Sequence, residues 1–179
     1  MANKLLPAAV VASRSKHTAT GEVDFDLYSI LNKVGKFVDA EIKAGIPVEN
    51  IVIGGFSQGG SVALYNALTS TLRYGGVVAF SCWLPLHTKF MSSPTLLTIP
   101  KDVPIFQCHG LDDCMIPFAM GKLTHELLNN FQLSKCELKC YPDLSHSSCE
   151  QEMEDSPAIT DFYFDAKSRY KIYMVVEKL

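Results

Sequence analysis

Residues 51–60 read Ile-Val-Ile-Gly-Gly-Phe-Ser-Gln-Gly-Gly, which predicts a short apolar strand, a sharp glycine-rich turn and then a helix from about Ser61 to Leu68. Residues 55–59 match the pattern G-x-S-x-G of a nucleophile elbow, in which a strained turn exposes one serine, here Ser57. The glycines suit this turn because a Cβ at either flank would collide with the strand or the helix. The alternative is a glycine-rich connection without chemistry, but a chance match is expected only about 0.05 times in a chain of this length.

The composition is that of a globular protein able to bury a substantial core. Of its 179 residues, 47% are hydrophobic and 20% are charged. We expect one domain over residues 1–179, in which residues 1–24 and 156–179 have the least regular patterns. The net charge of -3 provides no basic field to hold a nucleic-acid backbone, so we expect no nucleic-acid partner.

Cysteine usage and the N-terminal segment bear on the cellular compartment. Several of the six cysteines fall inside predicted strands, where a free cysteine behaves as a small hydrophobe. No two have C-x2-C spacing, and we expect neither a metal nor another cofactor. The apolar run at residues 5–12 is short and broken by Pro7, so we expect no signal peptide, and no run reaches the roughly 18 apolar residues of a membrane span. These features predict a cytoplasmic protein. The cysteines are Cys82, Cys108, Cys114, Cys136, Cys140 and Cys149.

Strand and helix patterns alternate along most of the chain. Besides the strand that opens the 51–60 segment, apolar or alternating runs predict strands at residues 75–81, 104–109 and 136–141. Besides the helix after the elbow, helical periodicity predicts helices at residues 30–43, 118–130 and 147–155. Strands that alternate with helices imply right-handed βα units, so the predicted fold class is α/β, with a mainly parallel sheet flanked by helices.

Weaker patterns give further expectations. Residues 8–12 fit a strand, residues 87–101 are expected to be irregular, and residues 156–179 fit a helix followed by a strand. The core-facing side chains expected on the two longest helices are Ile30, Leu31, Val34, Phe37, Val38 and Ile42, and Leu123, Leu127 and Leu128.

Three polar residues follow predicted strands in a meaningful order. In a parallel sheet, functional residues gather at the carboxyl ends of the strands. Ser57, Asp113 and His146 lie just past such ends, in the order serine, aspartate, histidine. A histidine can take the proton of a serine hydroxyl near neutral pH, and a carboxylate can orient the imidazole. The order therefore predicts a catalytic triad.

Other residues compete for these roles. The turn alone does not separate Asp112 from Asp113, and Asp143 is a third carboxylate that would otherwise cap the next segment. His146 alone follows the last clear strand before a helix, whereas His109 precedes Gly110 and is expected to be structural. The histidines expected at the surface are His17, His87 and His125.

These segments together resemble the acyl-protein thioesterase and lysophospholipase family of α/β-hydrolases. The similarity extends from about residue 25 to residue 155, and the matching segments are residues 41–47, 54–60, 81–86, 107–117 and 146–153. The resemblance implies that Ser57 is the nucleophile and His146 the base. It places the carboxylate four residues before the proline of its turn, which is Asp113 rather than Asp112.

The resemblance also implies binding roles and substrates. The backbone N–H of Gln58 would donate to the oxyanion, and Trp83, Leu84 and Pro85 would border an apolar acyl-binding groove; the alternative for this loop is simple packing. The implied reaction is the hydrolysis of palmitoyl-cysteine thioesters on S-acylated proteins, or of lysophospholipid esters. The implied partners are these substrates, with transient contact at a membrane surface.

One family feature is missing from the sequence. The family carries a His-Gly-Leu-Gly-Asp-type loop near the N-terminus that supplies a second oxyanion donor, but the only His-Gly pair here is His109-Gly110. The chain therefore resembles an internally shortened member whose sheet is truncated at its N-terminal side. Losing one donor would cost about 10²–10³ in turnover. Losing central strands would expose an apolar sheet edge, which favours self-pairing, for example as a homodimer.

The sequence thus leaves three functional hypotheses. The first is a thioesterase or esterase acting on acyl-proteins or lysophospholipids, and the second is a general carboxylesterase for short esters. The third is a catalytically impaired variant that retains acyl-chain or protein binding, which the missing loop favours.

Overall fold

The computed structural model describes residues 10–12, 16–17, 23–24, 27–156 and 171–177 of the chain. The expected helix before residue 171 and most of the N-terminal residues lie outside this description.

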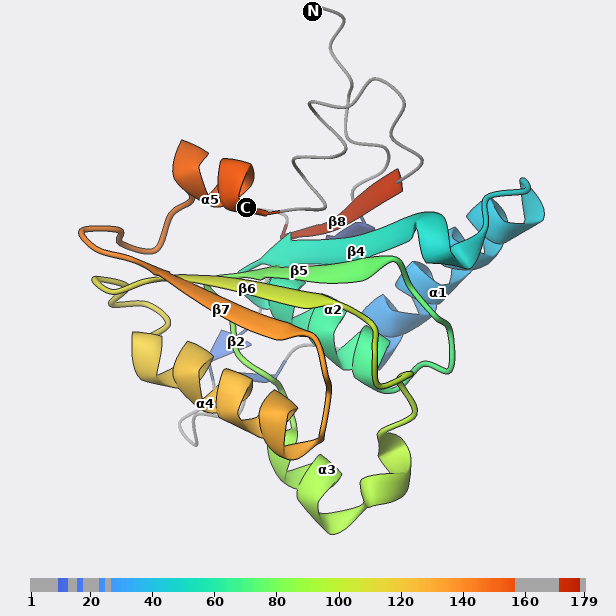
Figure 1. Cartoon of the computed structure of the whole chain (residues 1–179), viewed down its shortest axis with the longest axis horizontal. Coiled ribbons are helices and arrows are strands. Elements are labelled where there is room, and N and C mark those ends of the chain that lie inside the picture. The colour runs from blue at the N-terminus through green and yellow to red at the C-terminus, as the bar shows by residue number, and fades with distance from the viewer. Residues whose placement is uncertain (1–9, 13–15, 18–22, 25–26, 157–170, 178–179) are drawn as a thin grey trace, which may run out of the picture.

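A parallel sheet forms the centre of the molecule, as the alternation of strands and helices predicts (Figure 1). Its six strands lie in the order β1-β8-β4-β5-β6-β7, and every pair of neighbours is parallel. The strands of this sheet are β1 Val10–Ala12, β8 Lys171–Glu177, β4 Ile51–Phe56, β5 Gly76–Phe80, β6 Ile105–Gly110 and β7 Cys136–Tyr141. A separate antiparallel pair joins β2 Lys16–His17 to β3 Val23–Asp24. The α/β fold class is confirmed.

Helices cover the two faces of the sheet unequally within the described residues. In Figure 1, α2, α3 and α4 lie below the sheet, whereas α5 lies above it. The helices are α1 Leu27–Lys43, α2 Gln58–Leu68, α3 His87–Ser92, α4 Phe118–Asn130 and α5 Glu150–Asp155, with 3-10 turns η1 Val48–Asn50 and η2 Pro94–Leu96. The helix expected at residues 147–155 is therefore shorter than predicted.

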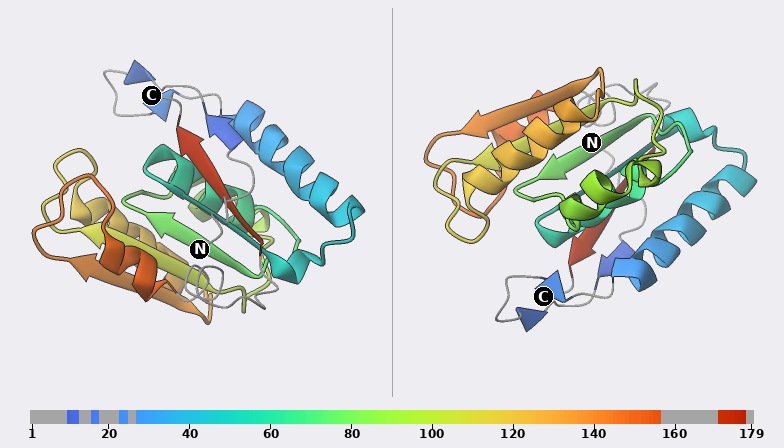
Figure 2. Two further views of the ribbon diagram at one scale, coloured as in Figure 1. Left: turned by 90° about the horizontal axis from the view of Figure 1, so that it is seen from above. Right: turned by 90° about the horizontal axis from the view of Figure 1, so that it is seen from below.

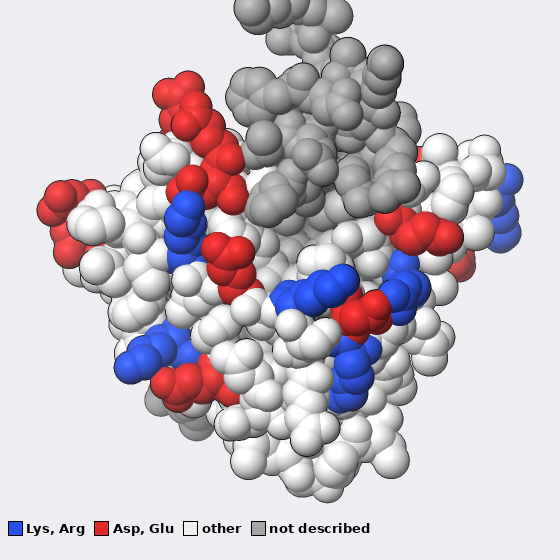
Figure 3. Space-filling model, in the orientation of Figure 1, with Lys and Arg blue, Asp and Glu red and all other residues white. Residues whose placement is uncertain are grey.

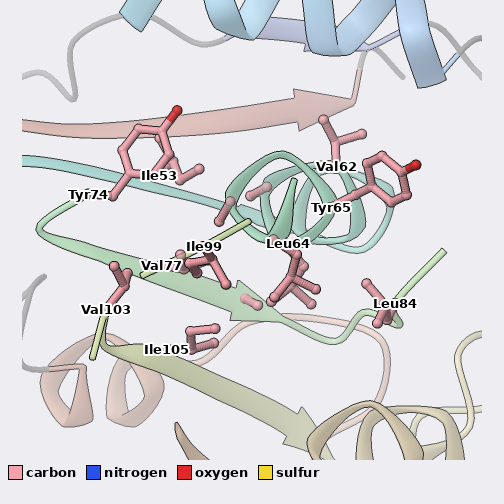
Figure 4. Packing of buried hydrophobic residues seen from close by; sticks show 14 of the residues in the cluster. Ile53, Val62, Leu64, Tyr65, Tyr74, Val77, Leu84, Ile99, Val103 and Ile105 are labelled. Carbon is pink, nitrogen blue, oxygen red and sulfur yellow. The ribbon is translucent and has the colours of Figure 1, made fainter. Parts of the chain in front are cut away.

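The main core lies between the sheet and the helices below it (Figure 4). Ile53, Val77 and Ile105 of neighbouring strands belong to one cluster with Leu64 of α2, and Val77 lies beside Ile99 in this view. Strands in the middle of a parallel sheet are buried on both faces, which is why β4 and β5 read as continuous apolar runs rather than as alternating ones. A smaller cluster on the opposite face includes Val52, Val78, Phe80, Phe106, Cys108, Tyr141 and Ile172.

Strand β8 occupies the position beside the elbow strand. Figure 2 shows β8 between β1 and β4, and Val52 of β4 pairs with Ile172. The side of β4 that faces away from β5 is therefore paired, contrary to the exposed edge expected from a shortened sheet. The position beside β4 is taken by a segment from far along the chain.

Several local expectations are wrong. Residues 87–101 are not irregular throughout, because α3 forms where the ring of Phe90 packs 5.4 Å from that of Tyr65 and 5.7 Å from that of Phe131. The inward face of α4 includes Gly121 and Thr124 in place of Leu123, which is exposed. On α1, Phe37 and Ile42 are also exposed, because the buried side chains follow the narrower series Leu27, Ile30, Val34 and Val38.

Candidate active site

The nucleophile elbow has the strained geometry that its sequence predicts. Ser57 joins β4 to α2 with φ 53° and ψ -124°, a conformation that side chains rarely adopt. Its amide donates to the carbonyl of Phe80 at 2.9 Å, which ties the turn to the end of β5. This turn holds Ser57 at the carboxyl end of the sheet.

The glycines of the elbow leave no space for side chains. A Cβ at Gly55 would lie 2.3 Å from the carbonyl carbon of Gly59, and one at Gly60 would lie 2.8 Å from the carbonyl oxygen of Gly55. Both close neighbours are backbone atoms, which cannot rotate away. The close approach of strand and helix therefore requires glycine at these two positions.

A continuous chain of hydrogen bonds joins the three residues predicted to form the triad. The Ser57 hydroxyl lies 3.0 Å from His146 Nε2, and His146 Nδ1 lies 2.7 Å from Asp113 Oδ2. With Nδ1 carrying the proton, the imidazole donates to the carboxylate and accepts from the hydroxyl. The Phe56 ring packs against His146, with 4.7 Å between centroids. The loops after β4, β6 and β7 thus bring together residues 89 positions apart.

The Asp113 carboxylate is buried and held on both oxygens. Its Oδ1 accepts from the amides of Met115 and Ile116, at 2.9 and 2.8 Å, while Oδ2 faces His146. Burial alone would raise the pKa of Asp113, but the hydrogen bonds from His146, Ile116 and Met115 and the charge of His146 hold this pKa below its ordinary value. The side chain is therefore ionised at neutral pH, as an acceptor for His146 must be.

The competing carboxylates lie in other positions. Asp112 is exposed, and its amide donates to the carbonyl of Leu144. Asp143 is also exposed, in a left-handed turn with φ 57°. The turn geometry therefore separates Asp113 from its neighbour, which the sequence of the turn alone could not do.

The other histidines differ in their surroundings. His109 is buried on β6, with Nε2 2.8 Å from the carbonyl oxygen of Ile116. His125 is not a free surface group, since its Nδ1 lies 3.3 Å from Gln107 Oε1. His87 is partly buried, and the side chain of His17 lies outside the described part of the structure.

The loop that carries His146 is anchored by α5. The Tyr141 hydroxyl donates to Asp155 at 3.0 Å, and Lys139 Nζ lies 2.8 Å from the same carboxylate. At the start of α5, the Cys149 amide donates to Glu152 at 3.1 Å in a capping box. Burial raises the pKa of Glu152 to about 7, although the Cys149 amide opposes this rise. Sequence reasoning missed Glu152, but its position three residues after the cap is the signal of such a box.

Gln58 begins α2, so its backbone N–H has no acceptor within the helix and points from the helix start, where the dipole favours negative charge. The Gln58 side chain is buried, and neither its Nε2 nor its Oε1 has a hydrogen-bond partner among the residues that the structure describes. The backbone N–H of Gln58, rather than its side chain, is therefore the hydrogen-bond donor that α2 offers next to Ser57.

The loop after β5 packs into the protein. The Leu84 side chain is buried in the main core, and its amide donates to Thr124 Oγ1 at 2.9 Å. Trp83 is partly exposed, and its amide lies 3.4 Å from Ser61 Oγ, one turn along α2 from the nucleophile. Contact of Trp83, Leu84 or Pro85 with an acyl chain stays a prediction.

A hollow of about 380 Å³ lies at the amino ends of β5, β6 and β7, lined by residues such as Gly76, Pro104 and Lys135. It is at the opposite end of these strands from the triad, so it takes no part in the site. Among the described residues, no group of three or more His, Cys, Asp or Glu side chains is arranged to hold a metal ion. None of the helices in the described ranges is both long and apolar enough to cross a bilayer. On the face shown in Figure 3, charges of both signs are interspersed, with acidic side chains gathered over α5.

Comparisons with known proteins place the chain in a family. The model of the Phospholipase/Carboxylesterase family matches residues 12–162. Acyl-protein thioesterase 1 of Cryptococcus neoformans is 36% identical over 137 residues, covering 70% of this chain and 57% of the relative. Acyl-protein thioesterase 1 of Neurospora crassa is 37% identical over 125 residues, covering 70% of this chain and 49% of the relative. The chain thus spans about half the length of these relatives.

Solved structures share the fold. Arabidopsis thaliana SOBER1 is 30% identical, with a TM-score of 0.66, and the match covers 78% of this chain and 65% of that one. Zea mays acyl-protein thioesterase 2 is 22% identical with a TM-score of 0.63, covering 79% of this chain and 67% of that one, and this likeness concerns the fold alone.

Proposed function

The chain belongs to the phospholipase/carboxylesterase family, and from this premise we propose that it is a serine hydrolase whose catalytic residues are Ser57, His146 and Asp113. The observation that carries the proposal is the continuous hydrogen-bonded path from the Ser57 hydroxyl through the imidazole of His146 to the Asp113 carboxylate. This path is the arrangement that activates a serine oxygen.

The reaction proceeds in two halves. The Ser57 oxygen attacks the acyl carbonyl carbon while His146 Nε2 takes the hydroxyl proton, and the Asp113 carboxylate stabilises the resulting imidazolium. The bond to the thiol or alcohol then breaks, and the proton on Nε2 passes to this leaving group. A water molecule, deprotonated by His146, attacks the acyl-serine and releases the acid and the free serine.

The oxyanion of each half-reaction needs N–H donors. The backbone N–H of Gln58 is suited to this role by its position at the start of α2. The sequence has no second His-Gly loop from which another donor would come. We therefore expect turnover about 10²–10³ lower than that of a family member with both donors.

The substrates that we propose are long-chain acyl thioesters on S-acylated proteins, with lysophospholipid esters as the related oxygen esters. The names of the Cryptococcus and Neurospora relatives support the thioester class. The six free cysteines support a reducing compartment such as the cytoplasm. Because the chain spans about half of each relative, a catalytically weak protein that retains acyl-chain binding is the second candidate.

A fluorophosphonate probe tests the proposal, because it reacts with an activated serine whatever the natural substrate. We expect slow, stoichiometric labelling of the wild-type chain and none of Ser57→Ala. Circular dichroism serves as the control that both proteins are folded. Absence of labelling in folded wild-type protein would contradict the hydrolase proposal, and binding of a fluorescent fatty acid by both proteins would then favour the second candidate.

A further inference from the structure

We propose that His109 is a positioning residue that holds the Asp113 carboxylate in line with His146, and that Gly121 of α4 sets the orientation of the His109 ring. The inference rests on the proposed catalytic roles of Asp113 and His146. It assigns a function to a buried histidine that the mechanism itself does not use.

The first observation is the contact between His109 and the turn that carries Asp113. His109 is the penultimate residue of β6, and its side chain is almost completely buried. Its Nε2 lies 2.8 Å from the carbonyl oxygen of Ile116, so Nε2 bears a hydrogen and donates it. The same nitrogen is 3.6 Å from Asp113 Oδ2, the oxygen that faces His146.

The second observation is that Ile116 binds Asp113 Oδ1, the carboxylate oxygen that does not face His146. The Ile116 amide donates to Asp113 Oδ1, while the Ile116 carbonyl accepts from His109. The turn is therefore closed by two hydrogen bonds that meet at one residue. If the imidazole moved, the Ile116 peptide would lose its donor and the carboxylate would lose a fixed neighbour.

The third observation is that α4 packs so closely against the His109 imidazole that it restricts the orientation of this ring. A Cβ at Gly121 would lie 2.4 Å from His109 Nδ1 and 3.0 Å from both Cε1 and Cγ. The Phe118 ring meets His109 in an edge-to-face contact, with 5.9 Å between centroids. Because the imidazole packs directly on the glycine, any side chain at position 121 must displace it.

The alternative role for His109 is packing alone. A packing residue would lower stability when replaced, but the folded molecules would keep their catalytic geometry. A positioning residue must change kcat, because a displacement of about 1 Å in a catalytic group costs up to 100-fold. The two roles therefore differ in activity per folded molecule.

The experiment compares His109→Phe, His109→Gln and Gly121→Ala with wild type, using hydrolysis of a 4-nitrophenyl acyl ester and labelling by the fluorophosphonate probe. We expect His109→Phe and Gly121→Ala to lose about 10- to 100-fold in kcat and in labelling rate, with little change in KM. Glutamine can place an N–H near the position of Nε2, so His109→Gln should recover much of the loss. The control is Val38→Ala on α1, which removes buried methyl groups away from the triad and should lower stability without this loss.

Proton NMR separates this inference from the hydrolase proposal. The hydrogen between His146 Nδ1 and Asp113 should give a low-field resonance in wild type, whether or not the chain turns over substrate. We expect this resonance to be lost or displaced in His109→Phe and Gly121→Ala but retained in Ser57→Ala and Val38→Ala. An unchanged resonance together with unchanged labelling rates in the two variants would overturn the positioning role. A resonance that is present in wild type and altered in the two variants, in a protein whose wild type fails to label, would overturn only the hydrolase proposal.

Discussion

At the scale of single residues, the site depends on positions where no side chain fits. The approach of β4 to α2 is so close that a methyl group at Gly55 would meet the backbone of Gly59, and the positive φ of Ser57 exists only because this approach is enforced. The G-x-S-x-G pattern predicted this close approach and the strained turn at Ser57 from the sequence. It could not show which of Asp112 and Asp113 faces His146, since that choice is made by the fold of the turn.

Replacement of Gly55 by alanine should destabilise the protein strongly. The new Cβ would lie 2.3 Å from a backbone carbon, so the strand or the helix must shift. We expect a loss of at least about 3 kcal/mol in the free energy of unfolding by urea, together with loss of probe labelling at Ser57.

Gly35→Ala is the matched control. Gly35 lies inside α1, and a Cβ there would have no neighbour within 4 Å in the described part of the chain. Alanine should raise the free energy of unfolding by about 0.5–1 kcal/mol, because glycine is a poor helix former. Equal effects of the two substitutions would contradict the proposed crowding at the elbow.

At the scale of elements, α5 matters because it anchors the loop of His146. The helix has only six residues and depends on Tyr141, Lys139 and the capping box rather than on its own propensity. The sequence predicted that a helix follows His146, but it placed the start at residue 147. The cap at Cys149 was not foreseen, because a cysteine is not a usual capping residue.

Glu152 should make stability depend on pH in the direction opposite to an ordinary ion-paired carboxylate. Its pKa is about 7 in the folded protein, against an ordinary value of 4.5, so the unfolded chain releases the proton first as pH rises. The stabilisation is present below about pH 4.5, falls as pH rises to about 7 and then levels off. Glu152→Gln should therefore show a flatter dependence of Tm on pH between about 5 and 7.

The control for this prediction is Glu150→Gln, on the exposed surface of the same helix. It should retain the wild-type dependence of Tm on pH. A Glu152→Gln protein with the same pH slope as wild type would show that burial of this carboxyl group does not govern the slope.

At the scale of the whole molecule, the order of strands is the feature that local patterns could not supply. The parallel α/β architecture followed from alternating strands and helices, and β4 to β7 lie beside one another in chain order. The apolar run at residues 172–176 indicated a strand but not its neighbours. The neighbours of a strand depend on which other strands have an unpaired edge where it packs, and a local sequence pattern does not contain this information. Its place between β1 and β4 emerges only in three dimensions.

Ile172→Ala should weaken the entire sheet rather than one end of it. Ile172 is fully buried, pairs with Val52 and packs in the cluster on the α5 face. We expect a loss of about 2–5 kcal/mol in the free energy of unfolding by urea. Ile42→Ala on the exposed side of α1 should change it by less than about 0.5 kcal/mol, and an equally small effect of Ile172→Ala would argue against β8 as a structural strand.

The central position of β8 has a consequence during protein synthesis. A ribosome releases residues 51–141, with β4 to β7, well before residues 171–177 leave the exit tunnel, at about 5–20 residues per second. During these seconds the nascent chain holds the elbow sequence but lacks the strand that completes its surroundings. The sheet therefore reaches its final form only after translation of β8, and until then the edge of β4 that pairs with β8 has no partner from this segment.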